Sequence, residues 1–163
     1  MAMNNEGYYA LDTALGEIGV IVMDGVPVGI SLTGDQRHMK AASGPPSGEV
    51  IDILEALRRY FAGHDIPDDL AGRLISRLDI SPFSREVYYE VASILMGKTL
   101  SYGEVAERAG KPGAARAVGG IMRANPYPIV IPCHRVIKSD GQPGGYGGRE
   151  DIKIWLLTFE GAR

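Results

Sequence analysis

The chain has 163 residues, of which 45% are hydrophobic and 23% charged, with a formal net charge of -3, as in a globular protein of one ordinary domain or two small ones. No stretch resembles a secretory signal and no apolar run is long enough to span a membrane, so we expect a cytoplasmic protein that does not act at a membrane. The single cysteine, Cys133, excludes an intramolecular disulfide, and with only His38, His64 and His134 beside it the chain lacks the ligand spacing of a zinc site.

The first half of the chain predicts strands followed by a helix. Short β-prone runs cover residues 8–15, 17–23 and 26–34, and Asp24-Gly25 between the second and third runs is a strong hairpin signal. Ser47 can cap a helix whose apolar residues recur at helical spacing. Nothing in this half carries chemistry, so we interpret residues 1–78 as a small α/β support domain.

The second half, residues 79–163, predicts further helices separated by glycine-containing breaks. Ser81 and Pro82 have the cap and first-position preferences of a helix start. Ser101 caps a short helix in which Glu104 is placed as in a capping box. A helix, a short glycine-containing turn and a second helix are the outline of a helix-turn-helix. The predicted helices cover residues 82–95, 102–109 and 114–124.

Charge separates the two halves. Residues 1–78 hold 6 basic and 11 acidic residues, whereas residues 98–138 hold seven basic and two acidic residues, a local balance of +5. Such polarity is compatible with a phosphate-binding face in the second half, although a solvated basic surface accounts for the charge alone equally well.

The last of the three predicted helices, "AARAVGGIMRA", has an unusual composition for a helix that reads the major groove. It lacks the Asn, Gln and Ser side chains that read base edges, and each glycine costs about 1 kcal/mol of helix stability relative to alanine. Small side chains let a helix backbone approach a partner closely. That partner is either another helix or the narrow minor groove, with Arg116 projecting into the duplex, and the local charge favours the minor groove.

Cys133 stands between an apolar run, "PIVIP", and the pair His134-Arg135. A buried free cysteine is most often a small hydrophobic residue. Here the apolar run predicts an extended, partly buried backbone up to Cys133, and a water molecule bridging to His134 can carry off the thiol proton. A basic, polar neighbourhood lowers the pKa of a thiol and favours the nucleophilic thiolate. The loop "SDGQPGGYGG" can approach a ligand closely, with Tyr146 as a wall or lid.

Several ordered motifs of the second half resemble those of the O6-alkylguanine-DNA alkyltransferase family. They are "GKTLSYGEVA", "AARAVGGIMR", "RANPYPIVIPCHRV" and "GGYGG" followed by "KIWLLTFEG", and they cover nearly all of residues 80–163. The first half is similar to the family only in size and in its strand-then-helix plan. The resemblance implies an α+β fold, with a small ribonuclease-H-like α/β domain over residues 1–78 and a mainly helical domain with a DNA-binding helix-turn-helix over residues 79–163.

The resemblance also implies an activity: DNA repair by irreversible, single-turnover transfer of the alkyl group from O6-alkylguanine to Cys133, after the base is flipped out of the duplex. His134 is then a water-mediated base that Glu160 orients. Asn125 holds the turn before the active-site strand, and Tyr102 donates a proton toward N3 of the departing guanine. No cofactor takes part, and the partner is double-stranded DNA, bound through its minor groove by a monomer. Activity on O4-alkylthymine is left open.

The other site residues implied by the resemblance form two groups, one contacting DNA and one lining the base pocket. In the first group, Arg116 fills the gap left by the flipped base, whereas Arg135 is open to either a phosphate contact or a structural role. The DNA-binding group comprises Arg116, Ala115, Ala117, Gly119, Arg123 and Arg135. The pocket group comprises Tyr102, Met122, Val136, Tyr146, Gly147, Gly148 and Lys153.

The chain departs from the family pattern at a few positions. Gly147 stands where some relatives have serine, but its expected contribution is a backbone N–H. Ser84 and Tyr88 stand where relatives often carry glutamine and tryptophan, and we expect compensation at these packing positions.

Three other functions fit parts of the pattern. A non-catalytic binder of damaged DNA, of the alkyltransferase-like kind, lacks the active cysteine, whereas this chain has an intact "PCHR". A helix-turn-helix regulator needs base-reading side chains on its second helix. A cysteine hydrolase with a Cys-His-Glu triad leaves the basic segment around Arg116 without a role. Alkyl transfer accounts for all of these features.

Overall fold

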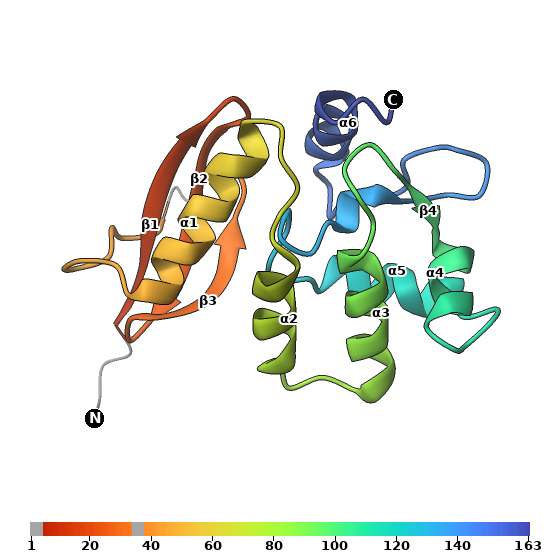
Figure 1. The fold of residues 1–163 in the computed structure, drawn as a ribbon, viewed down its shortest axis with the longest axis horizontal. Helices are drawn as coiled ribbons and strands as arrows, with labels where there is room; N and C mark the ends of the chain where they lie inside the picture. Colours follow the sequence, from red (N-terminus) through yellow and green to blue (C-terminus); the bar gives the residue numbers. More distant parts are fainter. Residues whose placement is uncertain (1–4, 34–37) are drawn as a thin grey trace. The chain divides into compact units, whose positions relative to one another are not determined.

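The computed structural model describes residues 5–33 and 38–163 and has a mixed helix-and-sheet fold made of two compact units. Unit 1 comprises the chain up to His64 together with Pro126–Pro128, and unit 2 comprises Asp65–Asn125 and Ile129–Arg163 (Figure 1). The division falls at residue 64 rather than at the expected residue 78, because the helix that follows His64 packs within unit 2. Gly34, the expected end of the third strand, lies outside the described residues. Over the described ranges, no helix is long and apolar enough to cross a membrane.

An antiparallel sheet forms one layer of unit 1. Its strands are β1 (Glu6–Thr13), β2 (Gly16–Met23) and β3 (Val26–Ser31), in that order across the sheet. Asp24 and Gly25 turn the chain between β2 and β3 with φ of 51° and 82°, the left-handed pair that a tight hairpin needs. The predicted hairpin is confirmed.

Helix α1 (Gly48–Phe61) covers one face of this sheet (Figure 1). The Ser47 hydroxyl accepts a hydrogen bond from the Val50 N–H at 3.5 Å, which confirms the predicted cap. Leu57 and Tyr60 are fully buried, and full burial of such a side chain stabilises a fold by about 1.5–3 kcal/mol.

A short later segment, Pro126–Pro128, also belongs to unit 1. The Pro126 carbonyl accepts a hydrogen bond from the Ile30 N–H at 2.8 Å, and the Tyr127 hydroxyl donates to the Pro27 carbonyl at 3.1 Å. These bonds satisfy backbone groups along β3 that the sheet leaves open.

Unit 2 begins with α2 (Asp68–Ser76) and α3 (Pro82–Ala92), which pack on each other. α2 is absent from the predicted elements, although it has two aspartates in its first turn and buries Leu70 and Leu74 at helical spacing. α3 begins at its predicted cap, where the Ser81 hydroxyl accepts from the Ser84 N–H at 3.1 Å. It ends at Ala92, before the predicted residue 95, because the backbone groups that follow bond to side chains from elsewhere in the unit.

The predicted pair of short helices is present as α4 (Tyr102–Arg108) and α5 (Ala115–Arg123). The capping box at the start of α4 is complete: the Ser101 N–H donates to Glu104 Oε2 at 2.7 Å, and the Glu104 N–H donates to Ser101 Oγ at 3.1 Å. Gly110 and Gly113 bound the turn, each with φ of 86°, a conformation that favours glycine.

The segment around Cys133 differs from the predicted extended strand. Ile129 has φ of 75°, Cys133 begins a 3-10 helix, η1 (Cys133–Arg135), and a two-residue strand, β5 (Val136–Ile137), comes only after it. β5 pairs in parallel with β4 (Leu100–Ser101), the residues directly before α4. The expectation of a strand was wrong because long-range bonds, rather than local apolar character, set this backbone.

Helix α6 (Glu150–Phe159) completes unit 2. It buries Lys153 and is followed at its C-terminal end by Glu160, so two of the expected site residues are placed by one helix that contacts η1.

Candidate active site

Cys133 is a buried thiol with polar neighbours. Its side chain is 5% exposed, and Sγ lies 3.7 Å from the Tyr146 hydroxyl. Burial raises the pKa of the thiol, against the opposing effects of hydrogen bonds from Asn125 and Tyr146 and of the charge on Lys153. The sequence-based expectation of a lowered pKa was therefore wrong, because desolvation outweighs the polar neighbourhood. The resting group is the thiol, and it needs a base to become a nucleophile.

The next residue, His134, has an imidazole ring paired with a carboxylate. His134 Nε2 lies 2.6 Å from Glu160 Oε1, and both side chains are fully buried. Burial lowers the pKa of His134, which keeps the ring neutral, and a neutral ring with its proton on Nε2 donates to Glu160 and leaves Nδ1 as its basic nitrogen. The structure thus brings together His134 and Glu160, as the resemblance implies.

Glu160 is held ionised in this buried position. Burial alone raises the pKa of its carboxyl, but the hydrogen bonds and charges of His134 and Arg135 overcome that effect and set the pKa at about 2. Arg135 Nε lies 3.0 Å from Glu160 Oε2, and Arg135 Nη2 lies 2.9 Å from Oε1, a bidentate arrangement.

This placement corrects one expected DNA contact. Arg135 is 3% exposed and its guanidinium is committed to Glu160. A buried, paired arginine cannot reach a DNA phosphate without leaving that carboxylate unpaired, which is strongly destabilising. Arg135 therefore belongs to the buried cluster and not to the DNA-binding group.

Lys153 and Tyr102 form a second pair beside the thiol. Lys153 Nζ donates to the Val136 carbonyl at 2.7 Å and to the Tyr102 hydroxyl at 3.2 Å. Burial lowers the pKa of Lys153 to about 8, with the Cys133 charge acting in the opposite direction. Burial raises the pKa of Tyr102, so its hydroxyl stays protonated at neutral pH. Both groups can deliver a proton near Cys133.

Asn125 organises the turn between α5 and the thiol. Its Nδ2 donates to the Ile131 carbonyl at 2.8 Å, which closes the chain around the left-handed Ile129. Because its side chain also bonds to Cys133, one amide side chain serves both the turn and the nucleophile.

The loop between β5 and α6 contacts this site through Tyr146. Tyr146 is held by its N–H, which donates to Glu150 Oε1 at 3.2 Å. Gly147 and Gly148 are exposed with left-handed φ of 61° and 83°, so their backbone is open to a ligand. A Cβ at Gly144 would lie 2.8 Å from the Tyr102 hydroxyl, so this glycine lets the loop approach Tyr102. Of the other expected pocket residues, Met122 and Val136 are buried.

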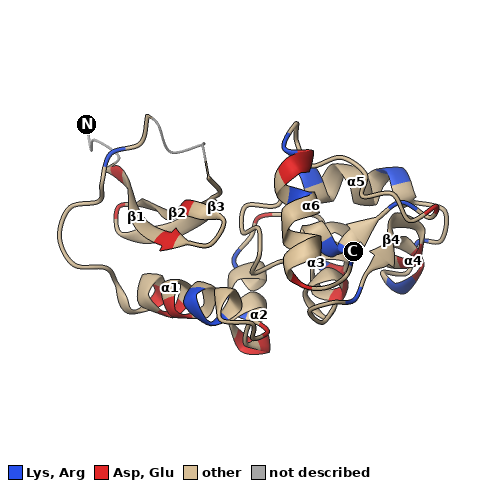
Figure 2. Ribbon diagram, turned by 90° about the horizontal axis from the view of Figure 1, so that it is seen from above, with Lys and Arg blue, Asp and Glu red and all other residues tan. Residues whose placement is uncertain are grey.

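The expected DNA-binding residues of α5 lie on and beside an exposed face of that helix. Arg116, Ala117 and Arg123 are exposed, and Ala115 is half-buried, whereas Val118 and Met122 on the other side are buried. Figure 2 shows basic residues on α5, whereas α1 carries acidic residues together with Arg58 and Arg59 in its last turn. Gly119 is half-buried near Tyr102, since a Cβ there would lie 4.0 Å from the tyrosine ring. A side chain at Gly119 would thus make only an ordinary contact with Tyr102, whereas Ala117 lies on the exposed face.

Comparison with known proteins identifies the family. Residues 82–162 match the model of the 6-O-methylguanine DNA methyltransferase DNA binding domain. The methylated-DNA--protein-cysteine methyltransferase of Methanothermobacter thermautotrophicus is 39% identical over 146 residues, which cover 89% of this chain and 80% of that protein. The chain belongs to the methylated-DNA--protein-cysteine methyltransferase family. The resemblance seen in the sequence motifs is confirmed.

Other members of this family, and a related protein with a different name, match along nearly the whole chain. The methyltransferase of Mycolicibacterium paratuberculosis is 38% identical over 94% of this chain and 91% of that protein. A DNA base-flipping protein of Thermus thermophilus is 34% identical over 89% of this chain and 95% of that protein. Among solved structures, Mycobacterium tuberculosis OGT in complex with DNA has a TM-score of 0.73 at 32% identity, covering 94% of this chain and 92% of that chain.

Several residues that line or support the methyltransferase site were not found from the sequence. Tyr88, noted only as a departure from the family pattern, donates its hydroxyl to the Ile121 carbonyl of α5 at 3.0 Å. Asp65 lies 3.5 Å from Arg135. No local signal marks Asp65, because its partner is distant in the chain.

Proposed function

We propose that this protein repairs DNA by transferring the alkyl group of O6-alkylguanine to Cys133 in a single, irreversible turnover. One observation carries the proposal: His134, the residue directly after the only thiol of the chain, forms a buried pair with Glu160. His134 Nε2 and Glu160 Oε1 are 2.6 Å apart. The family membership and the printed names of the relatives support it.

The first chemical step is formation of the thiolate. Because burial keeps Cys133 protonated and His134 neutral, the histidine can take the thiol proton, through a bridging water, onto Nδ1. The ionised Glu160 then balances the imidazolium charge. Lys153 and the Tyr146 hydroxyl stabilise the thiolate as it forms.

The second step is displacement at the alkyl carbon. The Cys133 sulfur forms a bond to that carbon as its bond to O6 breaks, and the guanine leaves with the bonding electron pair. Tyr102 donates a proton to N3 of the departing base, and Lys153, 3.2 Å from the Tyr102 hydroxyl, returns a proton to the phenolate. The product thioether has no route back, so each molecule acts once.

Substrate access requires that the base leave the duplex, since the thiol is buried. We propose that α4 and α5 act as a helix-turn-helix that binds the minor groove, with Arg116 filling the gap and Arg123, Ala115, Ala117 and Gly119 contacting the DNA. The pocket for the flipped base is then lined by Tyr102, Met122, Val136, Tyr146, Lys153 and the backbone of Gly147 and Gly148. In this proposal unit 1 is the ribonuclease-H-like support, no cofactor takes part, and the protein acts as a monomer in the cytoplasm, where a lone cysteine stays reduced.

Mass spectrometry of the protein after reaction with an O6-methylguanine duplex tests the proposal. We expect the tryptic peptide from Ala124 to Arg135 to gain one methylene unit, stoichiometrically and without turnover. A Cys133→Ala variant, which removes only the acceptor sulfur, should bind the same duplex and gain nothing.

A second function, recognition of the lesion without transfer, is favoured by the similarity to the Thermus thermophilus DNA base-flipping protein. It predicts tight binding of the O6-methylguanine duplex with no mass gain on Cys133. A protein that neither gains mass nor binds the lesion contradicts both functions and returns a cysteine hydrolase to consideration.

A further inference from the structure

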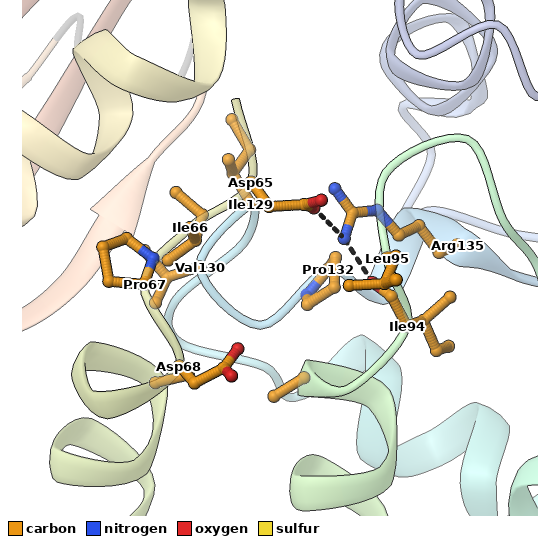
Figure 3. Close-up of a pocket in the computed structure, with 12 residues that line it drawn as sticks. Asp65, Ile66, Pro67, Asp68, Ile94, Leu95, Ile129, Val130, Pro132 and Arg135 are labelled. Carbon is orange, nitrogen blue, oxygen red and sulfur yellow. Dashed lines mark hydrogen bonds and ion pairs between the residues drawn. The ribbon is translucent and has the colours of Figure 1, made fainter. Parts of the chain in front are cut away.

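A cluster of charged groups extends the His134–Glu160 pair away from the thiol. Arg135 Nη1 lies 3.5 Å from Asp65 Oδ1 (Figure 3). The other guanidinium nitrogens, Nε and Nη2, bond to Glu160. Asp65 lies between α1 and α2 and is the first residue of unit 2. The buried guanidinium is therefore shared between the carboxylates of Asp65 and Glu160.

The same groups hold the loop that leads from α3 to β4. Asp65 Oδ1 accepts the Met96 N–H at 2.8 Å, and the Gly97 N–H donates to Glu160 Oε2 at 3.4 Å. Arg135 Nη1 donates to the Ile94 carbonyl (Figure 3). Backbone groups from 94 to 97 are thus bonded to all three charged side chains.

This loop connects directly to the reacting groups. It continues into β4, which pairs with β5 immediately after Arg135. β4 ends at Ser101 and is followed directly by Tyr102, the first residue of α4. A displacement of the loop therefore moves both the tyrosine and the residues that follow the thiol.

The two carboxylates also compete for one arginine. Glu160 Oε1 bonds to His134 Nε2 and to Arg135 Nη2, at 2.6 and 2.9 Å. If Asp65 loses its charge, the guanidinium is balanced by Glu160 alone and draws more strongly on Oε1. The bond from His134 to that oxygen then weakens, and the histidine becomes a poorer base.

We propose that Asp65 is a positioning residue of the active site, which holds Arg135 and the loop from 94 to 97 so that Glu160 keeps His134 in place as the base. The proposal rests on the proposed function in one respect, since the step that His134 serves is alkyl transfer. The position of the His134–Glu160 pair can be measured without that step.

Three substitutions of Asp65 separate its charge from its hydrogen bond. Asp65→Asn removes the charge and keeps an oxygen for the Met96 N–H, Asp65→Ala removes both, and Asp65→Glu restores the charge. Asp68→Asn is the matched control, because it removes an aspartate that lines the same small pocket and leaves the Asp65–Arg135 pair intact. Thermal melts of each variant establish that it is folded.

The first readout is the proton NMR signal of the His134 ring N–H bonded to Glu160, assigned by its loss in His134→Gln. The groups that face this ring are Glu160, Arg135 and Lys153, with Cys133 adjacent in the chain, and the substitutions leave all of them in place. We expect the signal to move upfield in Asp65→Asn, further in Asp65→Ala, and to return toward its wild-type position in Asp65→Glu. An unchanged signal in folded Asp65→Asn and Asp65→Ala overturns the proposal.

The second readout is the single-turnover rate of methyl transfer from an O6-methylguanine duplex. Partly exposed ion pairs have modest energies, so we expect a fall of about two- to fivefold in Asp65→Asn and about tenfold in Asp65→Ala. Asp68→Asn should change the rate less than twofold. Equal rates in wild type and both Asp65 variants also overturn the proposal. If wild type transfers no methyl group, the proposed function fails, and the His134 signal decides the role of Asp65 by itself.

Discussion

The two compact units bury different kinds of side chain. Among the described residues, the buried polar or charged set of unit 1 contains Ser31, whereas that of unit 2 contains His134, Arg135 and Lys153. The other buried residues of unit 1 among those described are apolar and lie on its sheet and its one helix.

Burying ionisable groups costs free energy unless each is paired, so a cluster of them indicates chemistry more than stability. In unit 2 every member has an oxygen partner: Glu160 for His134 and Arg135, and the Val136 carbonyl and Tyr102 hydroxyl for Lys153. The comparison predicts that substitutions of the buried ionisable residues of unit 2 change reactivity, and that core substitutions in unit 1 change stability alone.

The largest expected effect is on the carboxylate that pairs with His134. Glu160→Gln removes the charge that balances the imidazolium, and we expect the single-turnover rate of methyl transfer to fall by about 10²–10³-fold, the range of a general-base contribution. Glu107→Gln, an exposed glutamate of the same unit, is the control and should leave the rate within twofold. A Glu160→Gln protein that reacts at the wild-type rate would remove the base from the mechanism.

A core truncation in unit 1 tests whether this unit contributes to stability alone. Leu57→Ala empties part of a fully buried position on α1 and should lower the free energy of unfolding by about 2–5 kcal/mol in urea titrations. Ile51→Ala on the same helix, 45% exposed, should cost less than about 0.5 kcal/mol. At a temperature where Leu57→Ala is folded, its transfer rate should match wild type; a loss as large as that of Glu160→Gln would show that unit 1 takes part in the chemistry.

Acid should weaken the Glu160 cluster in a defined pH range. The folded pKa of Glu160 is about 2, below its unfolded value of about 4.5, so its contribution is complete above pH 4.5 and is lost as the pH falls toward 2. The shift corresponds to about 3 kcal/mol of unfolding free energy. His134, whose pKa is also lowered in the fold by burial, adds to the loss at acidic pH. Urea titrations of wild type and Glu160→Gln between pH 4.5 and 2 measure the contribution of Glu160 to the unfolding free energy. If both proteins lose the same stability over this range, the predicted contribution of Glu160 is contradicted.

The smallest expected effect concerns a neutral buried hydroxyl in unit 2. Burial, with the Cys133 charge, raises the pKa of Tyr88 to about 12, so the hydroxyl remains a donor to the Ile121 carbonyl at neutral pH. Tyr88→Phe removes that bond and should lower the free energy of unfolding by about 1 kcal/mol. Tyr89→Phe, at the adjacent and 39% exposed position, should be neutral within about 0.5 kcal/mol. Equal costs for the two changes would deny Tyr88 an anchoring role for α5.

Local features of the fold could be predicted because their physical cause is local. The caps at Ser47, Ser81 and Ser101 are confirmed because each serine bonds to a backbone N–H three residues ahead in the chain. The Asp24-Gly25 hairpin depends on two residues that tolerate left-handed φ. In contrast, the end of α3 and the turn at Ile129 were predicted wrongly, since bonds from Asp65, Arg135 and Asn125 determine them.

The site was predicted in part, and mainly through motif resemblance. Spacing alone does not connect His134 to Glu160, which are 26 residues apart, and the family motifs supplied that pairing. The direction of the Cys133 pKa shift was wrong because the sequence lists the polar neighbours of the thiol but not its degree of burial. Arg135 was placed with the DNA contacts for the same reason.

The sequence by itself determined the family, and the helices and hairpin whose caps and turns are encoded within a few residues. It also supplied Cys133 and His134 as the proposed nucleophile and base. The tertiary structure alone decided which charges are buried, that Arg135 faces Glu160 and Asp65, and that Cys133 rests as a thiol. Burial and ion pairing depend on distant segments meeting in space, and they outweigh local composition because desolvation of a charge costs more free energy than a single neighbouring residue supplies.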